Sequence, residues 1–371
     1  MIRKAYFLML AVSVRILAPG APVVADPASM HAAPLGFGSS CEHSWLTLHR
    51  GVRPVALPPL PGDMNSEGRG INSFGVVVGS SRGFDHAAAV IWNLLGEPRE
   101  LPPLPGHHGA EAHAINDHGE VAGISQGAGS TAVLWDQQGT PTPLLPLAGD
   151  AESVARGIND HGQVAGFSVR RSGVASDVGG VHLTPVVWDR HGTATPLPLP
   201  PGAIEAVALG INWRGDVVGF SFSPDYVDSV VAWSPSGTAR SLPVLGHDTR
   251  SEGHAINILG RVAGHSGDGA GDVAAVWNRP PQRRLPLAGD SGSEALAINT
   301  KGETAGWSVG PAGSTGVAWS AYGRSTPLLP LAGDTESQAY AMNDVGQVAG
   351  LSVGAAGHRA VVWDMRACQG L

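Results

Sequence analysis

Residues 116–125 read Asn-Asp-His-Gly-Glu-Val-Ala-Gly-Ile-Ser, and variants of this ten-residue stretch recur along the chain. Each variant begins with an Asn preceded by Ile or Met, and Gly follows three and seven residues later. The seven marker residues are Asn72, Asn116, Asn159, Asn212, Asn257, Asn299 and Asn343. Their spacing of 42 to 53 residues is typical of a repeat architecture.

A Trp follows each marker within the same unit. Seven of the ten Trp residues of the chain therefore occupy a single repeat position. These residues are Trp92, Trp135, Trp188, Trp233, Trp277, Trp319 and Trp363. A side chain this large at one fixed position predicts a repeated core contact.

Each unit contains the signals of four short strands. An Ala/Gly-rich segment leads into the marker, and Asn-x-x-Gly predicts a tight turn. A Gly-x-Val-Ala-Gly-x-Ser segment, an apolar run into the Trp and a Pro/Leu segment follow, as in residues 142–147. Proline cannot donate to a strand ladder, so the fourth strand should lie at an outer edge. Four antiparallel strands per unit predict an all-β, seven-bladed β-propeller.

The two ends of the chain complement each other. The seventh unit has no Pro/Leu segment after Trp363, whereas residues 44–62 contain one. We therefore expect an N-terminal strand to complete the last blade and to close the ring. Cys41 and Cys368 flank the two segments that would meet. An even cysteine count in an exported protein predicts a disulfide between them.

The N-terminal residues have the features of an export signal. Arg3 and Lys4 precede an apolar run over residues 6–14, and small residues precede Asp26. We divide the chain into a signal peptide at 1–25, a linker at 26–42 and the propeller at 43–371. The expected location is extracellular or periplasmic. No membrane span is expected, because no later segment approaches about 20 apolar residues.

Composition narrows the classes of partner. The 371 residues include 23 Lys and Arg against 31 Asp and Glu, a formal net charge of −8. Removing residues 1–25 takes away three basic residues and no acid, so 20 against 31 gives −11. This balance argues against nucleic acid as a partner. The 52 Gly and 29 Pro agree with many short turns.

The unit resembles the HAF-type extracellular repeat, which is named for a His-Ala-Phe triplet ahead of the Trp. Residues 116–125 and 159–168 carry the resemblance most clearly, and it extends over roughly residues 57–364. The triplet departs from the pattern, because only His86-Ala87 begins it properly and no copy has the Phe. The resemblance implies an exported bacterial repeat protein and brings no catalytic residues with it.

A second position in the unit varies from copy to copy, whereas the markers do not. Three residues before each marker stand Arg69, His113, Arg156, Leu209, His254, Leu296 and Tyr340. In a closed ring, units seven, one, two and three are neighbours, so Tyr340, Arg69, His113 and Arg156 would form an arc at the channel. Two residues earlier, Glu67, Glu111, Glu252 and Glu294 could form ion pairs with this position, which is the structural interpretation.

Two functional interpretations stand beside the structural one. As a binding site, Arg69, His113, Arg156, His254 and Tyr340 would hold a polysaccharide or another envelope protein. As a catalytic site, His113, His254 or Tyr340 would abstract a proton next to a carboxylate that an arginine neutralises. That arrangement is the layout of a polysaccharide lyase, and the analogy is with the fold alone.

Other motifs point to turns. Asp63, Asp150, Asp290 and Asp334 follow Gly between units, and single carboxylates lack the several ligands that Ca²⁺ requires. The histidines at 107, 108, 113 and 118 need not converge on strands and turns. We therefore predict no metal site and no cofactor. The predicted function is a non-enzymatic binding or interaction scaffold, with a carbohydrate-active lyase as the alternative.

Overall fold

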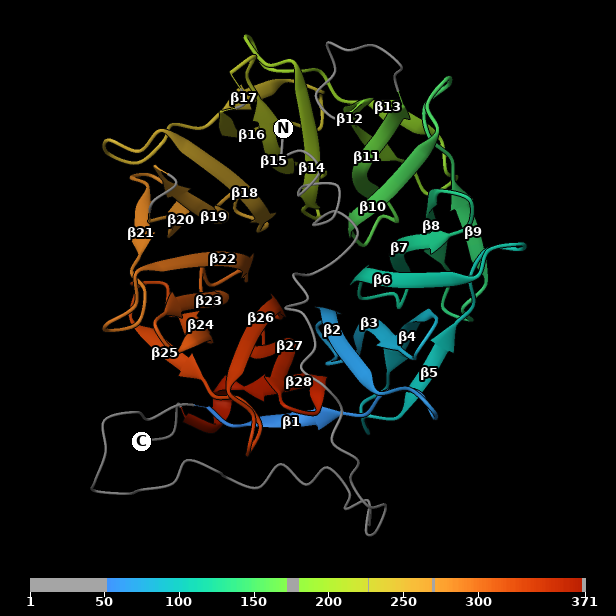
Figure 1. The fold of residues 1–371 in the computed structure, drawn as a ribbon. Coiled ribbons are helices and arrows are strands. Elements are labelled where there is room, and N and C mark those ends of the chain that lie inside the picture. The colour runs from blue at the N-terminus through green and yellow to red at the C-terminus, as the bar shows by residue number, and fades with distance from the viewer. Residues whose placement is uncertain (1–51, 172–179, 226, 269–270, 369–371) are drawn as a thin grey trace.

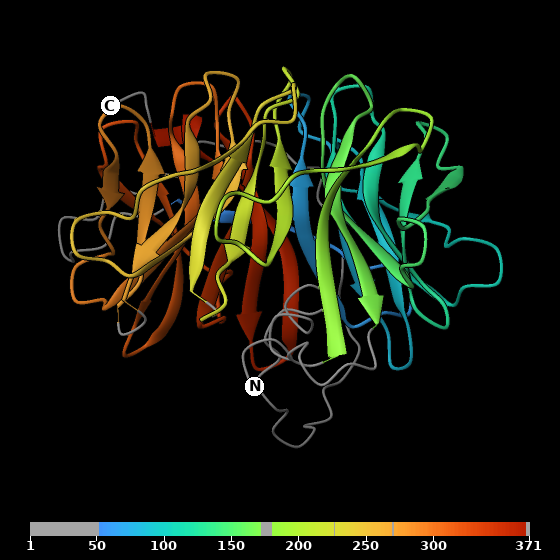
Figure 2. The same ribbon diagram turned by 90° about the horizontal axis from the view of Figure 1, so that it is seen from above.

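The computed structural model describes residues 52–171, 180–225, 227–268 and 271–368. In these residues, strands β1–β28 form seven four-stranded antiparallel sheets arranged as a ring of blades (Figure 1). Seen from the side, the ring is a short cylinder of upright blades (Figure 2). The predicted seven-bladed propeller is confirmed. The signal peptide at 1–25 and the linker at 26–42 lie outside the described residues.

The first two strands of each blade are the hairpin that contains the marker Asn. The first strands surround the central channel (Figure 1): β2 (Asn65–Ile71), β6 (Gly109–Ile115), β10 (Glu152–Ile158), β14 (Glu205–Ile211), β18 (Arg250–Ile256), β22 (Gly292–Ile298) and β26 (Glu336–Met342). The second strands follow the turn: β3 (Val77–Arg82), β7 (Val121–Gln126), β11 (Val164–Arg171), β15 (Val217–Phe222), β19 (Val262–Gly267), β23 (Thr304–Gly310) and β27 (Gln347–Gly354).

The third and fourth strands lie farther from the channel. The third strands are β4 (Ala87–Trp92), β8 (Ser130–Trp135), β12 (Val181–Trp188), β16 (Asp228–Trp233), β20 (Val273–Trp277), β24 (Gly313–Trp319) and β28 (Gly357–Asp364). The outer strands are β5 (Pro98–Leu101), β9 (Pro141–Leu144), β13 (Ala194–Pro196), β17 (Ala239–Ser241), β21 (Gln282–Arg284), β25 (Ser325–Leu328) and β1 (Pro54–Leu57). We number the blades 1 to 7 by their first strands, from β2 to β26.

Blade 7 takes its outer strand from the other end of the chain. β1 pairs antiparallel with β28, and the sheet order is β1-β28-β27-β26. Val52 also bridges to Leu328 of β25 in blade 6. The short 3-10 helix η2 (Met365–Cys368) follows β28. Cys41 and the Cys368 side chain lie outside the described residues, so the disulfide between them stays a prediction.

The repeated Trp joins neighbouring blades. All seven side chains are buried, with at most 5% of their surface exposed. Each indole N–H donates to a main-chain oxygen just after the outer strand of the preceding blade, as in Trp188 Nε1 to Leu145 O at 2.8 Å. Trp92 makes the same bond to Pro58 O, at 2.7 Å, across the junction of blades 7 and 1. Truncating one such Trp to Ala would cost roughly 3–5 kcal/mol.

The repeated Ser secures the turn between blades. Ser168 Oγ accepts the Leu147 N–H at 3.0 Å and donates to Asp150 Oδ2 at 2.6 Å. Asp63, Asp290 and Asp334 accept the equivalent bond from their own Ser residues. These aspartates therefore act in turns, as the sequence indicates, rather than as isolated cation ligands.

Candidate functional site

The marker Asn residues form a continuous belt at one mouth of the channel. Asn159 Oδ1 accepts the N–H groups of His161 and Gln163, which makes the tight turn. Its Nδ2 donates to the main-chain oxygen of Asn212, the marker of the next blade, at 3.1 Å. Among the described residues, six of the seven markers make this interblade bond, at 2.9 to 3.3 Å. The belt closes the ring where Asn343 donates to Asn72 O.

A pocket of about 290 Å³ opens inside this belt. It is lined by six of the seven markers, by the apolar residue before six of them and by the residue after each marker. We call the latter residues the mouth ring: Ser73, Asp117, Asp160, Trp213, Ile258, Thr300 and Asp344. The markers are identical in all blades, whereas the mouth ring differs, so the mouth ring gives the pocket its chemical character.

The mouth ring has an apolar side and an acidic side. Trp213 and Ile258 belong to neighbouring blades, and 51% of the Trp213 surface is exposed. The Trp213 ring lies 5.1 Å from the ring of His161, centroid to centroid. Asp117 and Asp160 each accept one main-chain N–H from the preceding blade through Oδ1, at 2.8 and 2.9 Å. Asp344 does the same for blade 6.

Sequence reasoning missed this pocket as a site because it interpreted the marker turns as structural. The signal was present in Trp213, which is one of only three Trp residues outside the repeat position and directly follows Asn212. An exposed aromatic residue at a turn that carries polar residues in most other units indicates a local role that differs from the repeat.

The variable position of the sequence analysis is a β-bulge in every blade. In each inner hairpin the register shifts across one unpaired residue, three before the marker. We call these residues the bulge ring: Arg69, His113, Arg156, Leu209, His254, Leu296 and Tyr340. Because bulges re-aim side chains, this position is free of the inward–outward alternation of its strand.

Arg69 is held in an ion-pair network rather than standing free. Its Nε lies 3.2 Å from Glu67 Oε1, and its Nη2 lies 3.8 Å from Glu111 Oε2 in blade 2. Arg82 binds the other Glu111 oxygen at 2.7 Å. Burial disfavours the charged form of Arg69, but Glu67 and Glu111 outweigh it and raise its pKa. Burial also opposes ionisation of Glu111, and His113, Arg69 and Arg82 outweigh it and lower the Glu111 pKa to about 2.

His113 bridges two blades. Its Nδ1–H donates to Ala155 O at 2.7 Å, and its Nε2 lies 3.9 Å from Glu111 Oε2. Burial, and then the positive charge of Arg156, lower the pKa of His113 to about 4. At neutral pH the imidazole is therefore uncharged and a weak base.

The remaining members of the arc are also enclosed. Tyr340 donates to Gln338 Oε1 at 2.7 Å and packs edge-on against Trp307. Burial, and then the charge of Glu67, raise the pKa of Tyr340 well above its usual value. Burial, and then Arg69, lower the pKa of Arg156 to about 10, so this side chain stays cationic. The structure thus brings the four arc residues together, with Arg69 paired to Glu67 and Tyr340 bonded to Gln338.

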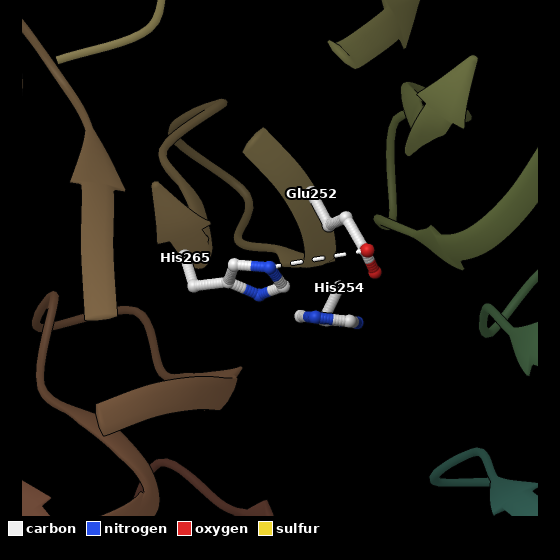
Figure 3. Close-up of side chains that lie close together, drawn as sticks. All are labelled: Glu252, His254 and His265. Carbon is white, nitrogen blue, oxygen red and sulfur yellow. Dashed lines mark ion pairs between the residues drawn. The ribbon is translucent and has the colours of Figure 1, made fainter. Parts of the chain in front are cut away.

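His254 lies outside the arc. Its blade is separated from the arc by Leu209 of blade 4 on one side and Leu296 of blade 6 on the other. Instead, it gathers with Glu252 of its own strand and His265 of β19 (Figure 3). Sequence analysis had not connected His265 with this group. The group arises because Glu252 and His265 are direct partners in the β18–β19 register.

Blades 3 and 4 replace polar residues by apolar ones at the same level. Where blade 5 pairs Glu252 with His265, blade 3 pairs Val154 with Phe167, and blade 4 pairs Val207 with Phe220. These four residues belong to one buried hydrophobic cluster, against which Leu209 packs. At this level, blades 3 and 4 are apolar on both strands, whereas every other blade has a polar residue on its first strand.

The other candidates are not brought together. Within the described part of the chain, one group of His and carboxylate side chains has its ligand atoms within 4.8 Å of one another. This group contains none of the histidines at 107, 108, 113 and 118. In the same residues, no helix is long and apolar enough to cross a membrane.

Comparisons with known proteins identify the fold and no family. No protein-family model matches the sequence, and no curated protein is significantly similar to it. A streptogramin B lyase structure is 11% identical, with a TM-score of 0.53, over 83% of this chain and 96% of that chain. A puromycin hydrolase S511A mutant is 12% identical, with a TM-score of 0.58, over 85% of this chain and 56% of that one. At such identity the likeness shows a β-propeller, and it does not carry an activity.

Proposed function

We propose that this protein is an exported, non-enzymatic binding module that acts at or outside the cell envelope, with its ligand in the mouth pocket. One observation carries the proposal. The mouth ring supplies one variable residue from every blade to a single pocket, on an invariant framework of Asn turns. Binding in repeat proteins resides in such variable residues on a constant scaffold.

The mouth ring favours a neutral saccharide. The Trp213 indole offers a flat apolar surface on which the apolar face of a sugar ring can stack. Asp117, Asp160 and Asp344 can accept hydrogen bonds from sugar hydroxyl groups, because within the described residues no bond engages their Oδ2 atoms. Three carboxylates around one pocket would repel a uronate or another anion.

The arc offers less support for a lyase. A general base works best with a pKa near the operating pH. The pKa of His113 is about 4, and the pKa of Tyr340 is raised by burial, so neither matches this requirement. Arg69, the residue that would neutralise a substrate carboxylate, is already paired with Glu67.

The proposal is tested by titrating the purified protein with neutral and acidic oligosaccharides, using calorimetry and Trp fluorescence. We expect saturable binding of neutral sugars and a loss of at least about fivefold in Trp213→Ala, since stacking contributes on the order of 1 kcal/mol or more. Phe74→Ala is the matched control, because Phe74 is an exposed aromatic residue of the blade 1 marker turn outside the pocket.

Two results would contradict this assignment. Equal affinity in Trp213→Ala and the unaltered protein would remove the mouth pocket as the site. Formation of unsaturated products, read by their ultraviolet absorbance and lost in His113→Ala, would instead establish the lyase. Export is tested separately by mass spectrometry of the protein secreted from a bacterial host, where we expect the chain to begin at Asp26.

A further inference from the structure

Blade 5 concentrates metal-binding side chains on its inner hairpin. Glu252 and His265 face each other across β18 and β19, and His254 follows Glu252 by two residues at the bulge. One ligand atom from each of the three side chains lies within 4.8 Å of the other two (Figure 3). His265 Nε2 lies 3.9 Å from Glu252 Oε1. Two tetrahedral zinc ligands would stand about 3.3 Å apart, so binding would draw the three side chains closer together.

A fourth donor group, a second carboxylate, comes from the next blade. Glu294 Oε1 of β22 lies 2.9 Å from His254 Nε2 and 3.8 Å from His265 Nδ1. These two ring nitrogens are buried, and neither makes a hydrogen bond of acceptable geometry within the described residues. Buried polar atoms in this state are rare in folded proteins and call for a ligand or another specific cause.

The surroundings of the cluster carry excess negative charge. Glu252 Oε1 and Glu294 Oε1 lie 3.9 and 3.8 Å from the two ring nitrogens of His265. Arg250 is the nearby cation, and it is engaged by Asp272. A bound dication would balance this charge.

We propose that Glu252, His254 and His265 bind a first-row transition-metal dication of the Zn²⁺ type between blades 5 and 6, with Glu294 beside it. Two imidazoles and a carboxylate are ligands that suit zinc, whereas Ca²⁺ and Mg²⁺ prefer oxygen alone. The ion would tie the inner hairpin of blade 5 to β22. The site is separate from the mouth pocket, whose lining includes none of these residues.

Blade 2 provides the internal comparison. It has Glu111 and His113 at the positions of Glu252 and His254, but Ile124 stands where blade 5 has His265. Arg69 and Arg82 also occupy the Glu111 oxygens. Blade 2 should therefore bind no metal, although it has two of the three ligands.

The test is a calorimetric titration of the chelator-treated full chain with Zn²⁺, and with Co²⁺ as a spectroscopic probe. We expect one high-affinity ion per chain, a rise of a few degrees in melting temperature, and the visible absorption of tetrahedral Co²⁺. His254→Ala and His265→Ala should each weaken binding at least 100-fold. Glu252→Gln, which keeps the side-chain shape, should weaken it at least tenfold and covers the case in which a His variant does not fold.

The controls separate this site from other histidines. His113→Ala and the pair His107→Ala with His108→Ala should leave the stoichiometry, affinity and Co²⁺ spectrum unchanged. The proposal is overturned if the unaltered protein shows no saturable binding, or if Glu252→Gln binds as well as the unaltered protein. It is equally overturned if the His107 and His108 variants, rather than those at 254 and 265, lose the ion.

Discussion

The marker belt and the bulge ring lie three residues apart in the same seven inner hairpins, yet one is invariant and the other uses four residue types in seven blades. Each marker Asn closes its own turn, and six of the seven are seen to donate to the next blade. The partners of these bonds are main-chain groups that recur in every blade, so the same residue fits each time. A bulge residue points into space shared with neighbours, so its identity depends on which residues those neighbours supply.

Each residue of the bulge ring therefore depends on its local contacts. Arg69 forms ion pairs with Glu67 and Glu111, and His254 forms one with Glu294. Leu209 packs on the apolar cluster of blades 3 and 4. Variation at one repeat position does not by itself indicate a ligand site. A ligand is indicated where a third ligand-bearing side chain joins the pair, as His265 does in blade 5, where blade 2 has Ile124.

The largest effect is expected from breaking an ion pair of the bulge ring. Arg69→Met should lower the free energy of unfolding by about 3–5 kcal/mol, because it leaves Glu67 as an unpaired buried carboxylate. Adding Glu67→Gln should restore part of the loss, since no charge then remains unpaired. Urea unfolding of both variants measures this, and a double variant no more stable than Arg69→Met would contradict the pairing.

The next largest effect is expected from removing one marker Asn from the belt. Asn159→Ala should cost about 3 kcal/mol, because it removes two turn bonds and an interblade bond at a site that is 4% exposed. Asn93→Ala is the matched control, since Asn93 accepts the same two turn bonds on the exposed outside of blade 1. The control should cost only about 1 kcal/mol. Equal losses in the two variants would show that the interblade bond contributes nothing.

The fold could be predicted almost completely from the sequence, because its determinants are local and repeated. The turn, the strand order and the outer position of the Pro/Leu strand all follow from residues within a single unit. The sites could be predicted only in part. The variable position was visible in the sequence, but its bulge and the contact of Arg69 with Glu111 of the next blade depend on three-dimensional packing.

The partnership of Glu252 with His265 was harder to predict from the sequence. Ile256 pairs with Val262 after the tight Asn-x-x-Gly turn, so a simple count along both strands would place Glu252 opposite Ser266. The bulge adds one residue to the first strand, and this shift hides the match from a simple count. Trp213 was missed for a different reason, because the whole marker turn was interpreted as structural.

A smaller effect concerns the proton equilibrium of the bulge ring. The pKa of His113 falls from its ordinary value to about 4 on folding, so the unfolded chain binds a proton that the folded protein excludes. The contribution of His113 to the free energy of unfolding is present above pH 6.5 and is lost as the pH falls toward 4, for a total of about 3 kcal/mol. His113→Gln should unfold with a correspondingly shallower dependence on pH in this window.

The control for this prediction is His118→Gln, which alters an exposed turn residue of the same blade. It should keep the full pH dependence of the unaltered protein, measured by urea unfolding at pH 7, 6, 5 and 4. Parallel curves for His113→Gln and His118→Gln would show that burial does not hold His113 in its neutral form.

The smallest expected effect distinguishes the mouth ring from the bulge ring as the ligand site. Tyr340→Phe removes the donor to Gln338 Oε1, whose amide also contacts Ser314, and should cost about 1 kcal/mol. Because Tyr340 does not line the mouth pocket, saccharide affinity should be unchanged in this variant. A fall in affinity without a larger loss of stability would place the ligand at the arc instead. The invariant belt would then be only the frame of the channel, and the bulge ring would be its binding surface.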